Sequence, residues 1–229
     1  MLTAYCRAVY YGPVRHGPSN KPSDVLRSVS LFLGRPLAIQ DCHFTTHEPA
    51  NVTDHDLTSL SNLPRPFDRP IKSTFLILHF RLARIIGQIQ CRCFGLHPRE
   101  YNDVLDCENM LDLYSKMLPP HFRLEAADTS LDGHEGYRWL RPQRQTLISK
   151  FHLARISLHR PYLLRSFGKR SDPQFMPSRE ACLLSSIADI NIRTTLTDTD
   201  PLDRFKWMTV SPQSTESSQA DMHSGGIRL

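Results

Sequence analysis

The sequence lacks two features that would assign it to a class at once: a long apolar run and a catalytic motif. No stretch of about 18 consecutive apolar residues exists, so we expect no membrane-spanning helix. The acyl-transfer elbow G-x-S-x-G is absent, as are the phosphate-binding patterns G-x-G-x-x-G and G-x-x-x-x-G-K-[ST] and the zinc motif H-E-x-x-H. No acid–base or nucleophile constellation stands out. The pattern therefore favours a protein that acts by binding and not by catalysis.

Metal-ligand spacing is also missing. The six cysteines form neither a disulfide framework nor the paired ligands of a structural zinc site, and we expect reduced thiols at Cys6, Cys42, Cys91, Cys93, Cys107 and Cys182. Cys91 and Cys93 fall at a predicted helix end, where residues two apart point about 200° apart. Cys42, His43 and His47 share a loop but lack a second ligand pair. The sequence therefore predicts no metal and no cofactor in this chain.

What the chain does contain is apolar residues and arginine. Hydrophobic residues make up 40% of the 229 residues, which excludes wholesale disorder and suits one domain. The net charge is +5, and 22 of the 28 basic residues are arginine. This excess permits contact with nucleic acid. We favour the other interpretation, in which arginines on solvated helix faces pair with Asp and Glu.

Helical periodicity is clearest in the middle of the chain. Residues 71–94 carry one apolar stripe about 100° wide, which ends at Gly95 and consists of Ile71, Phe75, Leu78, Leu82, Ile85, Ile86 and Ile89. A second helix is predicted over 98–118, because Pro119 and Pro120 cannot continue it. Its inner side comprises Tyr101, Val104, Leu111, Tyr114 and Leu118. A polar loop is expected over 121–140.

Two further helices follow. The third opens at Pro142 and is apolar on two sides, so we expect it to lie centrally, with its main stripe formed by Leu147, Phe151, Ala154, Leu158 and Tyr162. Pro161 should loosen the turn around Ser157. The fourth starts with Ser178 as N-cap and turns inward Ala181, Leu184, Ala188 and Ile192. The fold class is therefore predicted as all-α, with several helices.

The two ends of the chain differ from this helical core in composition. Residues 1–27 hold a Pro/Gly-containing linker, and a short helix should run from Ser23 or Asp24 to near Gly34. Residues 35–70 carry a high density of proline, which predicts an irregular, extended crossing segment. Residues 209–229 are rich in Ser, Thr, Gln and Gly and read as a disordered tail.

Several short blocks together resemble one known family. They are L-F-L-G-R-P-L-A-I at 31–39, L-P-P-H-F-R at 118–123, L-H-R-P-Y-L-L at 158–164 and S-R-E-A-C at 178–182. In this order they resemble the fungal-specific transcription factor domain, which is the middle homology region of zinc-cluster (Zn2Cys6) transcription factors. The resemblance covers residues 28–208. It divides the chain into a poorly matched segment 1–27, a partial regulatory domain 28–208 and the tail 209–229.

The resemblance implies a largely helical regulatory domain of a nuclear factor that regulates RNA polymerase II transcription. Zinc and DNA binding belong to the N-terminal cluster of full-length relatives, and this chain lacks that cluster. The implied partners are a protein or a second copy, contacted through the helices at 71–94 and 142–165, and a small-molecule effector is possible. The family-motif residues are Gly34, Arg35, Pro36, His159, Arg160 and Pro161. His159 and Arg160 either contact a ligand or partner, or satisfy polar groups near the Pro161 kink. We favour this structural role.

The match ends near Met208, while relatives continue with further helices. We therefore expect exposed apolar surface and marginal stability in isolation. Three alternatives remain open: a stand-alone helical interaction module that sequesters a longer relative, a non-functional fragment, and a helical enzyme.

Overall fold

The structure, a computed structural model, describes Arg27, Ser30, Leu31, Leu37 and Arg165 together with residues 48–53, 55–56, 64–95, 100–163 and 172–197. This part of the chain contains four long helices: α4 (Lys72–Cys93), α5 (Tyr101–Lys116), α6 (Leu140–Leu163) and α7 (Met176–Thr197). Short 3-10 turns occur at η2 (Pro120–Phe122), η3 (Glu135–Tyr137) and η5 (Pro173–Phe175). The described residues contain no strand, so the all-α prediction is confirmed.

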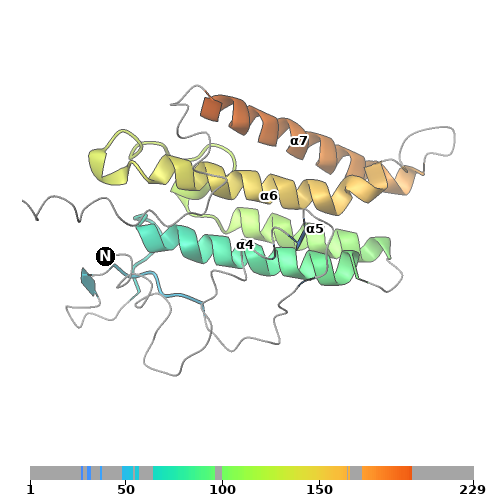
Figure 1. The fold of residues 1–229 in the computed structure, drawn as a ribbon, viewed down its shortest axis with the longest axis horizontal. Coiled ribbons are helices and arrows are strands. Elements are labelled where there is room, and N and C mark those ends of the chain that lie inside the picture. Colours follow the sequence, from blue (N-terminus) through green and yellow to red (C-terminus); the bar gives the residue numbers. More distant parts are fainter. Residues whose placement is uncertain are drawn as a thin grey trace, which may run out of the picture.

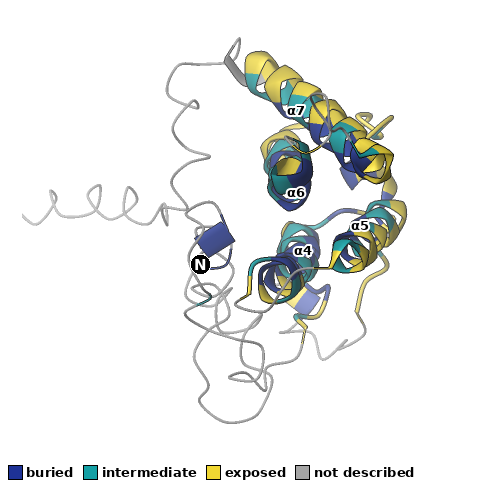
Figure 2. Ribbon diagram, turned by 90° about the vertical axis from the view of Figure 1, so that its right-hand side faces the viewer, coloured by how far each residue is buried: buried dark blue, intermediate teal, exposed yellow. Residues whose placement is uncertain are grey.

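Consecutive helices run antiparallel (Figure 1). Tyr114, near the end of α5, donates its hydroxyl to the carbonyl of Leu78 near the start of α4, at 3.1 Å. At the other end, the Sγ atoms of Cys93 and Cys107 lie 3.7 Å apart. Helix α6 lies between α7 on one side and α4 and α5 on the other (Figures 1 and 2). The prediction that this helix is central is confirmed.

The core forms where the apolar stripes of α4, α5 and α6 meet. The fully buried side chains include those of Leu78, Leu82, Ile89, Val104, Leu111, Leu147, Phe151 and Leu158. Tyr114 and Phe151 stack with ring centroids 6.3 Å apart, which joins α5 to α6. Every member of the predicted α6 stripe is buried. Periodicity therefore found the inner faces of these three helices, because most of the side chains buried there are apolar.

The connection between α5 and α6 differs from a simple polar loop. It opens with η2, where His121 and Phe122 are buried. The buried Arg144 of α6 donates to the His121 carbonyl at 3.2 Å and pairs with Asp132 of the loop. Phe122 belongs to the main core, so this loop is held from inside.

The segment before α4 is anchored at that helix's N-terminus. The Thr74 hydroxyl accepts the Ile71 N–H at 3.1 Å and donates to the Asn51 side chain at 2.9 Å. Asn51 in turn donates to the Arg65 carbonyl at 2.8 Å. Arg65 forms a two-bond ion pair with Asp56. The predicted crossing segment is thus tied to α4 wherever it is described.

Two details of the prediction are wrong. Helix α7 begins at Met176, so Ser178 lies inside its first turn and is not the N-cap. Leu184 is 55% exposed and does not face inward. At the end of α6, Pro161 does not terminate the helix, which continues to Leu163.

Several predictions fall outside the described residues. These are the motif residues Gly34, Arg35 and Pro36, the segment 1–26, and the tail 209–229. The short helix predicted near residues 23–34 is described only at Arg27, Ser30 and Leu31, which are helical. Among the described residues, no helix combines the length and apolarity needed to cross a bilayer.

Candidate functional site

The L-H-R-P-Y motif lies at the C-terminal end of α6, where α5 and α7 also converge. Its three predicted family-motif residues differ in exposure: His159 is 1% exposed, Pro161 is partly buried and Arg160 is exposed. A buried histidine needs partners for both ring nitrogens. The structure supplies one from each neighbouring helix.

His159 links three helices through hydrogen bonds. Its Nε2 lies 2.9 Å from a carboxylate oxygen of Glu108 on α5, and its Nδ1 lies 2.9 Å from the hydroxyl of Ser178 on α7. Tyr101 of α5 places its hydroxyl 2.9 Å from the same Ser178 oxygen. Arg155 of α6 donates to Glu108 at 2.7 Å. We call Tyr101, Glu108, Arg155, His159 and Ser178 the His159 cluster.

The ionisation of Glu108 sets the direction of these hydrogen bonds. Burial raises the pKa of this carboxyl, but hydrogen bonds from His159 and Arg155 outweigh it, and the net pKa is lowered. A carboxylate only accepts, so His159 donates from Nε2 to Glu108. Nδ1 shares a hydrogen bond with the Ser178 hydroxyl, which also bonds the Tyr101 hydroxyl. Both ring nitrogens of His159 and both carboxylate oxygens of Glu108 therefore have a partner.

Ser178, His159 and Glu108 share the residue types of a hydrolase triad, but their arrangement does not suit catalysis. Ser178 is 0% exposed and His159 is 1% exposed, so no substrate atom can reach the hydroxyl in this structure. The ring is also reversed, because the triad template bonds the serine to Nε2 and the acid to Nδ1. The cluster is built to hold α5, α6 and α7 together.

A second polar link fixes α7 on α6 nearer its other end. The buried Ser149 donates to Asp189 at 2.6 Å, and Arg193 donates to the other carboxylate oxygen of Asp189 at 2.7 Å. Together with Ser178, this link determines the rotation of α7 about its own axis. The inner face of α7 is consequently small and polar, with Ser178, Ala181, Cys182, Ser185 and Asp189 all buried.

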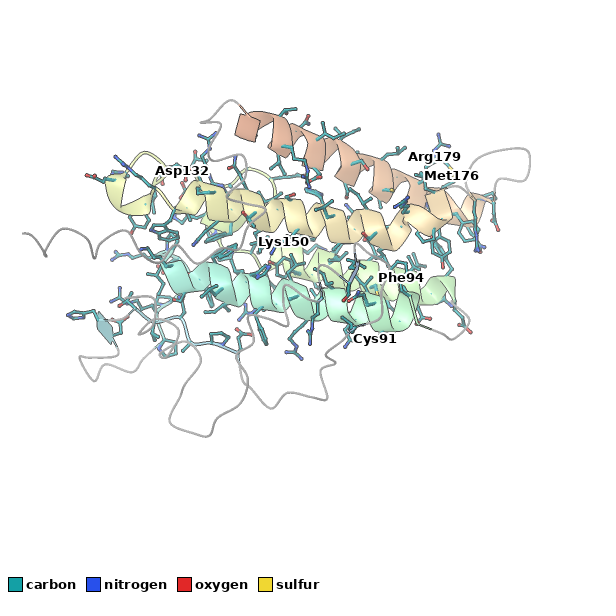
Figure 3. The ribbon with its side chains drawn as sticks, viewed as in Figure 1. Cys91, Phe94, Asp132, Lys150, Met176 and Arg179 are labelled. Atoms are coloured by element: carbon teal, nitrogen blue, oxygen red, sulfur yellow. The ribbon has the colours of Figure 1, made fainter. Side chains whose placement is uncertain are left out.

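The opposite face of α7 is apolar and exposed, as its outer ribbon shows in Figure 2. The exposed fractions are 47% for Met176, 44% for Leu183, 55% for Leu184, 57% for Ile187 and 58% for Ile190. Figure 3 places the labelled Met176 and Arg179 at the start of this helix. Single exposed apolar residues are ordinary, but a continuous row marks a contact surface. The expected exposed apolar surface is confirmed. Most of it lies on α7, and Leu105, Leu113 and Met117 of α5 and its C-cap are exposed as well.

Arginines that could suggest nucleic-acid binding are engaged with acids. Ion pairs join Arg65 to Asp56, Arg81 to Glu48, Arg92 to Asp103 and Asp106, Arg144 to Asp132, and Arg155 to Glu108. Lys150 of α6, which is labelled in Figure 3, instead donates to His79 of α4 at 2.6 Å. This is the pairing that we favoured for the arginine excess.

Three of the four cysteines in the described part of the chain, Cys93, Cys107 and Cys182, pack as small buried residues. Cys91 is exposed, Cys93 is buried, and Figure 3 places Cys91 and Phe94 at the end of α4. The contact between Cys93 and Cys107 raises the pKa of the Cys93 thiol and lowers that of Cys107. No group of three or more His, Cys, Asp or Glu side chains suited to a metal exists among the described residues. Cys42, His43 and His47 lie outside them.

Sequence reasoning found His159 but missed its partners. Glu108 carried a signal, because it continues the Tyr101–Val104–Leu111 stripe at helical spacing and is the charged residue within it. A charged residue in an apolar stripe calls for a buried partner. The position of Ser178 gave no such signal, because serine at a helix start suggests a cap first.

Comparison with known proteins gives one curated similarity. The chain is 26% identical over 186 residues to an uncharacterized transcriptional regulatory protein of Schizosaccharomyces pombe. The match covers 79% of this chain and 23% of that protein, so the chain spans less than a quarter of its relative's length. No family model matches the chain. No solved structure matches it either.

Proposed function

We propose that this chain is part of a transcription regulator and that residues 28–208 form a partial regulatory domain of the fungal zinc-cluster type. The observation that carries the proposal is the similarity to the transcriptional regulatory protein of Schizosaccharomyces pombe, which extends over 79% of the chain. The ordered motif blocks support the finer assignment. On this proposal the protein acts in the nucleus on RNA polymerase II transcription, and zinc and DNA binding reside in a part of full-length relatives that this sequence does not contain.

The geometry supports regulation by contact and not by reaction. The serine and the histidine of the His159 cluster, whose residue types could take part in a reaction, are buried. The apolar face of α7 is exposed. Such a face favours a protein partner, because desolvating it is favourable and requires no small polar ligand. A small-molecule effector remains part of the proposal for the longer protein, but no described residue is assigned to it.

A tethering experiment tests the proposal. The full chain is fused to an unrelated DNA-binding domain and placed upstream of a fungal reporter gene. We expect reporter transcription to change at least severalfold relative to the DNA-binding domain alone. Ile187→Glu on α7 should reduce the change, and Leu113→Glu, an equally exposed apolar position on α5, should not. An unchanged reporter with a stable, nuclear fusion would overturn the regulatory assignment.

Reading the full-length transcript of the gene tests the finer assignment. An upstream C-x₂-C-x₆-C array in the same reading frame is expected if the domain belongs to a zinc-cluster factor. A transcript confined to this chain would instead favour the alternative, a helical module that binds a protein partner. The exposed face of α7 is the observation that favours this second candidate.

A further inference from the structure

The exposed face of α7 has the repeat of a coiled-coil seam. Moving along the helix, separations of four, three, four, three and four residues connect Met176, Glu180, Leu183, Ile187, Ile190 and Thr194. All six are exposed, and all lie opposite the buried Ser178–Ser185–Asp189 side. A 3.5-residue repeat with apolar residues is the pattern that packs against another helix along its length. The seam therefore specifies a helical occupant that runs alongside α7.

The order of residues in the seam makes it complementary to itself in one direction. If two copies of α7 cross head to tail about a two-fold axis at Ile187, Ile187 meets its own copy. Leu183 then faces Ile190 of the second copy, so the three apolar positions pair with apolar positions. In the same arrangement Glu180 faces Thr194, which is a small and uncharged neighbour.

Charge favours this antiparallel direction over the parallel one. Antiparallel packing brings Glu180 beside Arg193 of the second copy, because Arg193 precedes Thr194. Arg193 is partly exposed, with 36% of its side chain accessible, and it is held in place by Asp189. Parallel packing would instead place Glu180 against Glu180, and like charges across a helix pair are destabilising.

We propose that the chain forms a two-fold symmetric, antiparallel dimer through the α7 seam, with a second copy of the same chain as occupant. The polar links from Ser149 and from the His159 cluster hold the seam outward. This inference names the partner for the contact surface of the proposed function. The dimer proposal and the proposed function can fail independently of each other, because a monomeric chain can still regulate a reporter.

The size of the seam sets the expected affinity. A helix of 22 residues is about 33 Å long, and a single helix pair buries less than the roughly 800 Å² per partner of a standard interface. We therefore expect a concentration-dependent dimer with a Kd of about 1–100 μM. Sedimentation velocity of the full chain should show twice the 26.3 kDa chain mass at the highest concentration and monomer at the lowest.

Matched variants test whether α7 carries the contact. Ile187→Glu places two carboxylates opposite each other at the two-fold axis and should weaken the dimer at least tenfold. Leu113→Glu is the control, because Leu113 is 60% exposed on α5 and lies outside the seam. Both positions are exposed, so circular dichroism should show unchanged helicity for both variants. A wild-type chain that stays monomeric at about 500 μM, or a dimer that Ile187→Glu leaves intact, would overturn the proposal.

Cross-linking tests the direction. Leu183→Cys and Ile190→Cys are made separately in a Cys91→Ser background, and the two purified chains are mixed and mildly oxidised. Antiparallel packing predicts a disulfide between the two different variants and little within either alone, which peptide mass spectrometry distinguishes. Cross-linking of each variant to itself, without the mixed product, would exclude the antiparallel dimer. A wild-type chain that stays monomeric in sedimentation would leave the seam to another protein or to a further segment of a longer chain, and would also overturn the proposal.

Discussion

At the scale of single residues, several buried polar side chains of this protein are paired across helices. His159 is the central case, because its two ring nitrogens reach Glu108 on α5 and Ser178 on α7. Its neighbour in the same motif, Arg160, is exposed to solvent. Two adjacent motif residues therefore have different roles, and removing each should have a different effect.

Replacing His159 should destabilise the fold strongly. His159→Leu removes one hydrogen-bond partner from the buried Ser178 hydroxyl and one from the Glu108 carboxylate. We expect a loss of about 2–4 kcal/mol in the free energy of unfolding, measured by equilibrium urea denaturation. Arg160→Ala should change it by no more than about 0.5 kcal/mol. Equal effects for the two variants would contradict a structural role specific to His159.

His79 gives the protein a predictable sensitivity to acid. Burial, assisted by the positive charge of Lys150, lowers the pKa of His79 from 6.5 to about 3. Between these values the unfolded chain binds a proton at this residue and the folded chain does not. Stability is therefore lost as the pH falls from 6.5 towards 3, by at most about 1.4 kcal/mol per pH unit from this residue.

His79→Gln tests that dependence, because glutamine can still accept from Lys150 but does not titrate. Unfolding free energies are measured by urea denaturation at several pH values between 4 and 7 in both proteins, a range chosen to cover the unfolded-state titration. The variant should show a shallower decline towards acid pH. If the unfolding free energies of the two proteins decline in parallel with pH, His79 takes up its proton equally in the folded and the unfolded state.

At the scale of elements, α7 is amphipathic in an unusual sense: its inner face is small and polar, and its outer face is large and apolar. Ser178, Ala181 and Ser185 are almost fully buried, whereas Ile187 and Ile190 are more than half exposed. Small residues allow the helix to approach α6 closely, and hydrogen bonds from Ser178 and Asp189 fix its rotation.

Enlarging the inner face of α7 should therefore be costly. Ala181→Leu inserts extra methylene groups where α7 packs closely, and we expect a loss of about 1–3 kcal/mol in unfolding free energy. Leu184→Ala, one turn away on the exposed side, should change it by less than about 1 kcal/mol. Thermal and urea denaturation of both variants check this. A larger effect from Leu184→Ala would contradict the assignment of Ala181 to the inner face of α7 and of Leu184 to its exposed face.

At the scale of the whole molecule, much of the positive charge in the described part of the chain is held in ion pairs. Arg65, Arg81, Arg92, Arg144 and Arg155 each pair with a carboxylate in the described part of the chain. The net charge of +5 is modest for 229 residues. Affinity for DNA depends on lysines and arginines that neutralise phosphates, and paired arginines do this less well.

The chain by itself should consequently bind DNA weakly and without sequence preference. We expect a Kd no tighter than about 10⁻⁶ M at physiological salt, measured by fluorescence anisotropy with a random duplex and a GC-rich duplex. Binding should fall further as salt is raised. A nanomolar, sequence-selective complex would contradict this expectation and would place a DNA-reading surface within the chain.

The helical class, the positions of α4, α5 and α6, and their inner faces could be predicted from the amino-acid sequence. These follow from apolar periodicity and from Pro119, Pro120 and Gly95, which act locally and need no knowledge of neighbours. The sequence also singled out His159, without identifying its partners.

Which face of α7 turns inward depends on contacts with other helices and could not be predicted. The hydrophobic pattern predicted that Leu184 faces inward. The interface with α6 is instead formed by small residues and by polar side chains that have partners on other helices. Such partners are remote in sequence: Glu108, His159 and Ser178 come together across 70 residues of chain. Their pairing satisfies buried polar groups, and that requirement outweighs the burial of a few more methyl groups on a single helix. The apolar seam on the outside of α7 is the consequence.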